Sequence, residues 1–342
     1  RHAVLASAHR LRLMTMHRLL AAASPRIVAA LAGGCALSAY VANSRVPAQA
    51  APDAKKQKTE APGYSAPQRT NPAWKQEMLD GQMKIGCSIN TSSPLVTEMC
   101  ASIGYDFLLI DQQHSAIDPE KLRSLITAAH AGGAKTMVRV GGAYDRIGIQ
   151  QAFDLGSDAI LVPCSRTAED VKHAVSCAKY PTHGPGSKGG SRSVYVNVRP
   201  QFPGGFGSLF EYIEQRGNAE TIVAAQIETK DALENIDEIC AIDGLDMAFV
   251  GPGDLCTDMG LTAKHGLQKA FGTPEYQDAC KVVVDKCKKY GKIAGFWNSD
   301  VTGKAEMGFR FLVVDGDIHS MQAALTKSLK EKRELMEKAG VL

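Results

Sequence analysis

Two apolar runs that each lead into a carboxylate constrain the fold of this chain more than any other feature. Residues 221–225 (TIVAA) lead into Glu228, and residues 245–250 (LDMAFV) lead into Asp254. Runs of this length and composition are typical of buried parallel strands. Because residues 230–240 between them have helical spacing, the segment predicts one strand–helix–strand unit with neighbouring parallel strands.

The two carboxylates should lie side by side at the carboxyl ends of these strands, where parallel α/β folds bind their ligands. Two hard oxygen donors with room for water and substrate suit Mg²⁺, Mn²⁺ or a similar divalent ion. The spacing alone leaves a second interpretation open, in which Glu228 and Asp254 are helix-capping or loop acids.

Strand and helix patterns alternate along the rest of the chain. Eight β/α units in about 260 residues predict a (β/α)₈ TIM barrel. The expected strands are 84–89, 107–110, 136–140, 159–163, 221–227, 245–250, 292–296 and 311–314. We assign the barrel domain to residues 76–342.

The N-terminal region has a different composition. Residues 1–50 contain six Arg and neither Lys nor acidic residues, which is typical of a mitochondrial targeting segment. A secretory signal is the alternative, because an apolar stretch at 27–41 precedes Ala48-Gln49-Ala50. Since the chain does not open on Met, Met14 or Met16 is a candidate start. We expect residues 51–75, rich in Ala, Pro, Lys and Gln, to be a disordered linker.

Charge and cysteine content exclude several classes of protein. Beyond the Arg-rich segment acids slightly outnumber bases, so nothing indicates a nucleic-acid surface. The nine Cys form no CxxC pair, which argues against a zinc cluster or a disulfide framework and favours a reducing compartment.

One connection interrupts the regular alternation of strands and helices. About forty residues separate Tyr180 from Thr221, and they include the Gly-rich runs 184–190 and 202–207. Loops of this length in compact domains are usually functional or disordered. The segment comes after the fourth predicted strand, so we expect it to form an active-site lid on the face that carries the carboxylates.

Polar residues mark three other element ends. His114 directly follows the second predicted strand, Arg139 ends the third, and Asp154 ends the helix before the fourth. A histidine at the carboxyl end of a barrel strand lies on the face where such folds catalyse reactions. Three alternatives remain: a structural histidine, an ion pair of Arg139 with a neighbouring strand-end acid, and a bond from Asp154 to the adjacent loop.

From about Asp80 to Lys327 the chain resembles the HpcH/HpaI aldolase family of metal-dependent class II pyruvate aldolases, near its macrophomate synthase-like branch. Five separated signatures, in the right order, carry this resemblance. They are DxxH at 111–114, VR at 138–139, LVP at 161–163, QIET at 226–229 and GPxDL followed by DMG at 251–260.

The resemblance implies a role for each matching residue. Glu228 and Asp254 match the ligands of a divalent metal ion, Mg²⁺, Mn²⁺ or Co²⁺. His114 matches the catalytic base, Asp154 the acid that pairs with it, and Arg139 the group that steadies the enolate oxygen.

The resemblance also implies substrate contacts and shows two departures. Gln226 matches a polar group near the metal, and the backbone N–H groups of Gly253 and Asp254 match those that hold the substrate carboxylate. Lys188 stands where the family often has an Arg that contacts substrate, and it cannot make the same bidentate contact. Gln113 replaces the usual acid before the catalytic His.

The expected function is cleavage of a 4-hydroxy-2-oxo acid to pyruvate and an aldehyde. One alternative is decarboxylation of oxaloacetate, with or without a following carbon–carbon bond formation. Another is a metabolite-binding barrel that has lost catalysis through Gln113. The expected partners are a small 2-oxo acid and further copies of the chain, because the resemblance implies a homo-oligomer, often a hexamer built from dimers that exchange the last helix.

Overall fold

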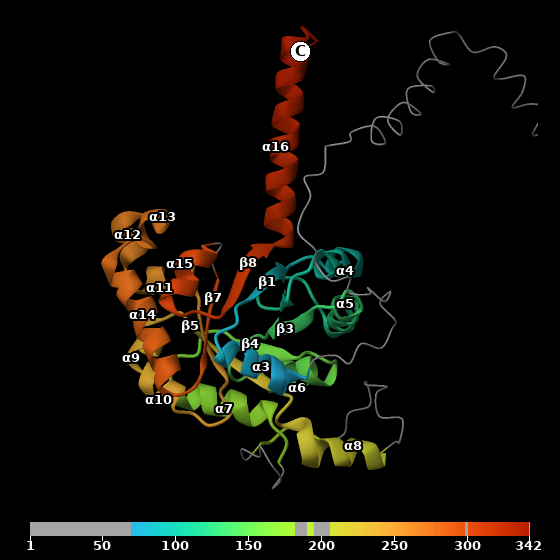
Figure 1. Cartoon of the computed structure of the whole chain (residues 1–342), viewed down its shortest axis with the longest axis vertical. Helices are drawn as coiled ribbons and strands as arrows, with labels where there is room; N and C mark the ends of the chain where they lie inside the picture. The colour runs from blue at the N-terminus through green and yellow to red at the C-terminus, as the bar shows by residue number, and fades with distance from the viewer. Residues whose placement is uncertain (1–69, 182–189, 195–205, 298–299, 342) are drawn as a thin grey trace, which may run out of the picture. The chain divides into compact units, whose positions relative to one another are not determined.

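The computed structural model describes residues 70–181, 190–194, 206–297 and 300–341. Within these ranges eight parallel strands form a closed barrel in sequence order (Figure 1). They are β1 (Lys84–Ile89), β2 (Phe107–Asp111), β3 (Lys135–Arg139), β4 (Ala159–Val162), β5 (Ile222–Ile227), β6 (Met247–Val250), β7 (Ile293–Trp297) and β8 (Phe311–Gly316). The predicted TIM barrel is confirmed, and no strand boundary differs from the expected one by more than two residues.

Helices precede, connect and follow the strands, and most of them surround the barrel (Figure 1). They are α3 (Asn71–Leu79), α4 (Pro94–Ile103), α5 (Pro119–Ala131), α6 (Arg146–Asp154), α7 (Ala168–Ala178), α8 (Phe206–Tyr212), a π-helical turn (Ile213–Gly217), α9 (Lys230–Glu234), α10 (Ile236–Cys240), α11 (Pro252–Asp258), α12 (Leu261–His265), α13 (Leu267–Ala270), α14 (Pro274–Lys289), α15 (Val301–Met307) and α16 (Asp317–Lys338). Among the described residues no helix combines the length and apolarity needed to span a membrane.

Aromatic side chains fill the barrel at the amino ends of its strands. Phe107 stacks on Phe311 with ring centroids 3.8 Å apart, and Trp74 of α3 meets both rings edge-on. Gly86 makes room for this packing, because a Cβ there would lie 2.4 Å from the Phe107 ring. This end of the barrel is therefore a packed core, and ligand access is left to the opposite end.

The helix α3 begins inside the segment that we predicted to be a linker. Thr70 caps it by accepting a hydrogen bond from the Ala73 N–H, and its Trp74 and Met78 side chains are buried under the barrel. Residues 71–75 are therefore helical, because burial of these two side chains stabilises the helix. The predicted targeting segment at 1–50 and the linker up to 69 lie outside the described residues and stay predictions.

The long insertion after Tyr180 does not leave the barrel where we expected. The helix α7 lies between β4 and the insertion, so the insertion starts at the end of α7 and next to the amino ends of the strands. Its two ends are joined there, because Tyr180 N–H donates to Asn218 Oδ1 (2.6 Å) and Asn218 Nδ2 donates to the Tyr180 carbonyl (3.1 Å). The prediction that the insertion emerges on the carboxyl face was wrong, because it overlooked the helix that returns the chain to the opposite face.

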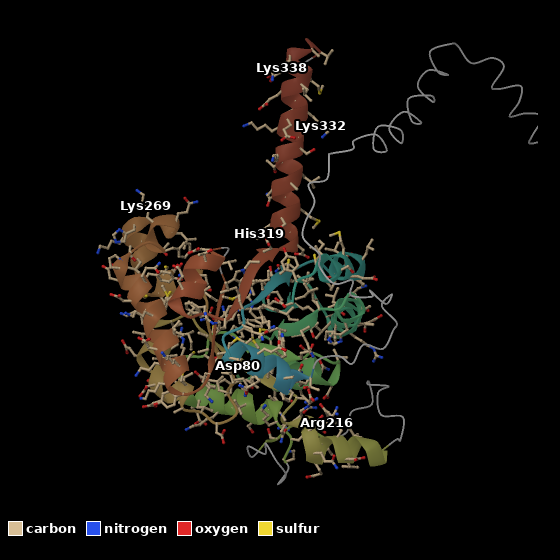
Figure 2. The ribbon with its side chains drawn as sticks, viewed as in Figure 1. Asp80, Arg216, Lys269, His319, Lys332 and Lys338 are labelled. Atoms are coloured by element: carbon tan, nitrogen blue, oxygen red, sulfur yellow. The ribbon has the colours of Figure 1, made fainter. Side chains whose placement is uncertain are left out.

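The last helix, α16, does not pack along its own barrel. Among the helices and strands its main contacts are with β1 and β8, next to the point where it starts. Figure 2 shows it standing clear of the barrel, with side chains from His319 to Lys338 along its length. Apart from Asp317 its residues are exposed or half-buried, including Leu325 at 69%.

Candidate active site

The alternation of side chains along the strands brings polar groups together at the carboxyl end of the barrel. Leu109, Met137 and Ala224 belong to the apolar cluster inside the barrel. Side chains two residues further along a strand point to the same side. The side chains of Asp111, Arg139 and Gln226 therefore also point into the barrel. Glu228, two residues beyond Gln226, points the same way.

Glu228 is tightly held at this end, with only 3% of its surface exposed. Its Oε1 accepts a hydrogen bond from the Cys164 N–H and its Oε2 accepts one from Gln226 Nε2, both at 2.6 Å. Gly251 leaves the space that this arrangement needs, because a Cβ there would lie 2.5 Å from Oε2 and 2.6 Å from Nε2. The carboxylate is thus fixed from three directions.

Asp254 lies beside Glu228, in the exposed first turn of α11. Burial raises the pKa of Glu228, the Cys164 N–H lowers it, and the negative charge of Asp254 raises it again, with a net upward shift. The two carboxylates therefore lie within electrostatic reach of each other, and their mutual repulsion is of the kind that a bound cation relieves.

The donors at this end fit a divalent cation. Gln226 Oε1 is buried without a hydrogen-bond partner beside the Glu228 carboxylate. In the described parts of the chain, no three His, Cys, Asp or Glu side chains form a complete metal site. Glu228 and Asp254 would therefore hold the cation with two protein ligands, and water and substrate oxygens would supply the others.

Arg139 faces the same opening and is held by Asp111. Its Nε and Nη2 donate to the two oxygens of Asp111 at 2.9 and 2.7 Å. Burial alone would raise the pKa of Asp111, but the hydrogen bonds and charge of Arg139 outweigh it and lower the pKa. The ion-pair interpretation of Arg139 is thus correct. The arginine charge also acts to lower the pKa of Glu228, so Arg139 lies within electrostatic reach of the candidate metal ligand.

His114 follows β2 on an exposed loop whose backbone is held by Asp111. The N–H groups of Gln113 and His114 donate to Asp111 Oδ1 at 3.1 and 3.3 Å. Within the described residues the His114 imidazole has no hydrogen-bond partner. It is therefore available to a substrate, and no carboxylate of the described residues is bonded to it.

Asp154 does not meet His114 in this chain. It ends α6, which returns the chain toward the start of β4, so it lies toward the end of the barrel opposite His114. Its Oδ1 instead accepts hydrogen bonds from Nη2 (2.6 Å) and Nε (3.2 Å) of Arg192, whose guanidinium lies over the rings of Phe153 and Tyr180. We correct the expected pairing accordingly, and the alternative of a bond from Asp154 to a loop is the one observed.

The other predicted substrate-binding residues are Gly253, Asp254 and Lys188. Gly253 and Asp254 occupy the first turn of α11, where backbone N–H groups have no acceptor within the helix and can bind a carboxylate. Lys188 lies outside the described residues.

Sequence reasoning missed three contributors, of which period-two alternation could have found two. Asp111 and Trp297 are inward-facing residues at the ends of β2 and β7, and both contact Arg139: Asp111 accepts its hydrogen bonds, and the Trp297 ring centre lies 4.9 Å from its Cζ. The third, Cys164, contributes its backbone N–H from a left-handed conformation (φ 51°), which the sequence does not signal.

A closed parallel barrel whose carboxyl end carries three acids, an arginine and an accessible histidine has the architecture of a (β/α)₈ enzyme. The family model described as HpcH/HpaI aldolase/citrate lyase matches residues 84–308. The chain belongs to this family and is a carbon–carbon lyase of the class II pyruvate aldolase type, which confirms the resemblance seen in the sequence.

Individual relatives are consistent with this assignment. The chain is similar to 4-hydroxy-2-oxovalerate aldolase of Novosphingobium aromaticivorans, with 33% identity over 58% of this chain and 72% of that protein. It is similar to hydroxypyruvate/pyruvate aldolase of Sagittula stellata, with 30% identity over 73% and 94%. The crystal structure of macrophomate synthase shares the fold, with a TM-score of 0.67 at 24% identity over 83% of this chain and 99% of that one.

The fit around Glu228 makes Gly251 a sensitive position. We expect Gly251→Ala to weaken Mn²⁺ binding about 10-fold or more, because the new methyl group would displace Glu228 or Gln226. Isothermal titration with Mn²⁺ measures this, and circular dichroism checks the fold. Gly253→Ala is the matched control, since a Cβ there meets nothing within 4 Å. Equal Mn²⁺ affinity of the two variants would contradict the arrangement.

Proposed function

We propose that this chain is a divalent-metal-dependent lyase that cleaves a 4-hydroxy-2-oxo acid to pyruvate and an aldehyde. The observation that carries the proposal is the buried, fixed Glu228 beside Asp254, with Arg139 facing the same opening. The relatives named as 4-hydroxy-2-oxovalerate and hydroxypyruvate/pyruvate aldolases support the substrate class.

A divalent cation held by Glu228 and Asp254 would act as a Lewis acid toward the 2-oxo acid. Arg139 keeps its Nη1 without a partner in the described structure, while Asp111 occupies the other two nitrogen positions. Arg139 can therefore donate a hydrogen bond from Nη1 to the oxygen on which negative charge develops as the enolate forms. A preorganised donor of this kind contributes about 3 kcal/mol to transition-state stabilisation.

His114 is the candidate base. Its imidazole takes the proton of the 4-hydroxyl group as the C3–C4 bond breaks, so the C4–O bond becomes the aldehyde carbonyl. The electron pair of the broken bond forms the C2–C3 double bond of the enolate. Protonation at C3 then gives pyruvate, and the exposed imidazole can exchange its proton with solvent. General base catalysis of this kind contributes about 10²–10⁴-fold.

The environment of His114 favours one alternative substrate. Asp154 is paired with Arg192, and Gln113 replaces the neighbouring acid, so no carboxylate orients the imidazole within the described chain. Decarboxylation of oxaloacetate gives the same enolate and needs no base at a hydroxyl group. The same barrel opening therefore also supports an oxaloacetate decarboxylase.

Pyruvate release from a panel of 4-hydroxy-2-oxo acids and from oxaloacetate separates these functions. We expect retro-aldol turnover that requires Mg²⁺, Mn²⁺ or Co²⁺ and falls about 10²–10⁴-fold in His114→Ala, while any oxaloacetate decarboxylation falls much less. A lactate dehydrogenase-coupled assay with a chelator control measures both. If no substrate released pyruvate while Mn²⁺ still bound, the chain would be a non-catalytic metabolite-binding barrel.

We further propose that the chain forms dimers that exchange α16, and that these assemble into a hexamer. The α4 stripe, Leu95, Met99 and Ile103, recurs every fourth residue and is exposed by 50–77%. The α16 stripe is similarly spaced along one side of that helix and consists of Ile318, Met321, Leu325 and Leu329. Because α16 does not cover its own barrel, the α16 of a second copy is the occupant that the α4 stripe fits.

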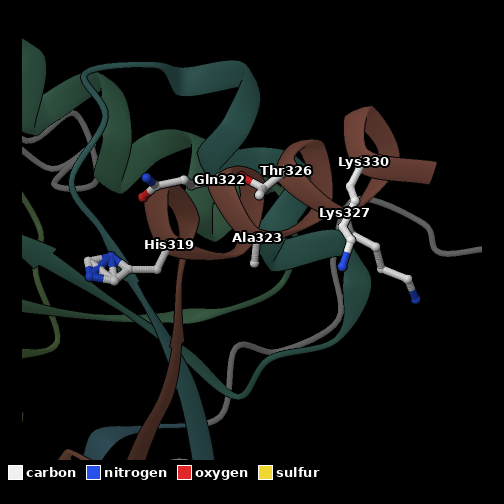
Figure 3. A pocket seen from close by; sticks show the side chains of 6 residues that line it. All are labelled: His319, Gln322, Ala323, Thr326, Lys327 and Lys330. Atoms are coloured by element: carbon white, nitrogen blue, oxygen red, sulfur yellow. The ribbon is translucent and has the colours of Figure 1, made fainter. Parts of the chain in front are cut away.

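The flank of α16 next to this stripe has a different character. An open surface pocket of about 480 Å³ is lined by His319, Gln322, Ala323, Thr326, Lys327 and Lys330 (Figure 3). Apart from Ala323 the residues of this flank are polar or basic, whereas the stripe consists of apolar residues, so the two faces of the helix can be tested independently.

Light scattering after size exclusion tests the exchange. The chain has a mass of 36.6 kDa, and we expect the wild type to run as a multiple of that mass. Leu325→Glu should shift it toward the monomer, because a charge would replace an apolar contact, whereas Lys327→Glu on the polar flank should not. A monomeric wild type, or equal masses for the two variants, would contradict helix exchange.

A further inference from the structure

Trp297 makes a contact that crosses the whole barrel. It is the last residue of β7, and its ring centre lies 4.9 Å from the Cζ atom of Arg139 at the end of β3. In the closed order β1 to β8 these two strands are four places apart in either direction, so they stand on opposite sides. The indole and the guanidinium therefore meet over the centre of the barrel.

The ring also marks the boundary between two layers. Trp297 is half-buried and packs against the apolar cluster inside the barrel, which includes Met247 and Phe249. Above this cluster lie the polar residues Asp111, Arg139 and Glu228. The indole thus covers the dry interior and faces the opening in which a substrate would bind.

Arg139 is consequently held on two sides. Asp111 takes its Nε and Nη2, and the Trp297 ring lies against the guanidinium. With these contacts made, the plane of the guanidinium is fixed, and so are the directions in which the Nη1 N–H groups can donate. An arginine that lost the ring could tilt toward the barrel interior while it kept its bond to Asp111.

We propose that Trp297 is a positioning residue for Arg139 and forms the floor of the substrate pocket, so that a 2-oxo acid lies on its indole ring. This inference rests on the proposed function of the barrel opening. It assigns to β7 a part of the site that neither the sequence signatures nor the candidate metal ligands include.

Kinetics of two Trp297 variants test the positioning role. Trp297→Leu removes the aromatic face, and we expect kcat to fall about 10-fold, with a smaller change in KM, because the arginine acts on charge that develops in the transition state. Trp297→Phe keeps a ring and should lose much less. Trp74→Phe is the matched control at the other end of the barrel and should leave both constants unchanged. Equal kcat for Trp297→Leu and Trp74→Phe would overturn the role.

Fluorescence tests the floor of the pocket without turnover. The chain has two Trp residues, so Trp297→Phe leaves only Trp74 and Trp74→Phe leaves only Trp297. Pyruvate with Mg²⁺ should change the emission of the wild type and of Trp74→Phe, but not of Trp297→Phe. Calorimetry with the same pyruvate and Mg²⁺ shows that each variant still binds. An unchanged Trp297 signal on confirmed binding, or a full signal in Trp297→Phe, would overturn the proposal.

The two proposals fail separately. If the wild type cleaves a 4-hydroxy-2-oxo acid and neither experiment responds to Trp297, the function stands and the role of Trp297 is refuted. If no substrate turns over but pyruvate changes the Trp297 emission, the pocket floor stands and the lyase activity is refuted.

Discussion

The site depends on the burial of one carboxylate, Glu228, at the carboxyl end of a closed barrel. An acid that is 3% exposed is costly unless its surroundings compensate for the lost hydration. Here the N–H of Cys164 after β4, the amide of Gln226 on β5 and the space left by Gly251 after β6 meet at this one side chain. Three successive strand ends therefore fix its position, because β4, β5 and β6 are neighbours in the sheet.

The two ends of the barrel are filled by different kinds of side chain. Aromatic rings of Trp74, Phe107 and Phe311 pack the end that α3 covers. The inward positions at the other end carry Asp111, Arg139 and Glu228. Because every second side chain of a strand points inward, the charged layer lies directly above an apolar layer of low dielectric constant. Charges in such a setting interact more strongly than they would in water, which suits stabilisation of an enolate.

Much of this arrangement follows from the sequence, and particular residues show where sequence reasoning ends. Apolar runs predicted all eight strands because parallel strands are buried on both faces. The rule that neighbouring strands end together then predicted that Glu228 and Asp254 are neighbours. We predicted the wrong end of the barrel for Asp154, because a motif fixes the position of a residue along the chain and not the end of the barrel at which it lies. The direction of α6, which runs back toward the amino ends of the strands, would have given the correct end. Its true partner, Arg192, lies 38 residues away and has no local signal.

The central claim is that Glu228 and Asp254 jointly hold one cation. Calorimetric titration of Mn²⁺ into the wild type, Glu228→Gln, Asp254→Asn and the double variant tests it most directly. The account predicts one Mn²⁺ per chain in the wild type, strong loss of affinity in each single variant, and little further loss in the double variant, because either change breaks the same site. Wild-type affinity in either single variant would contradict a shared cation and with it the proposed chemistry.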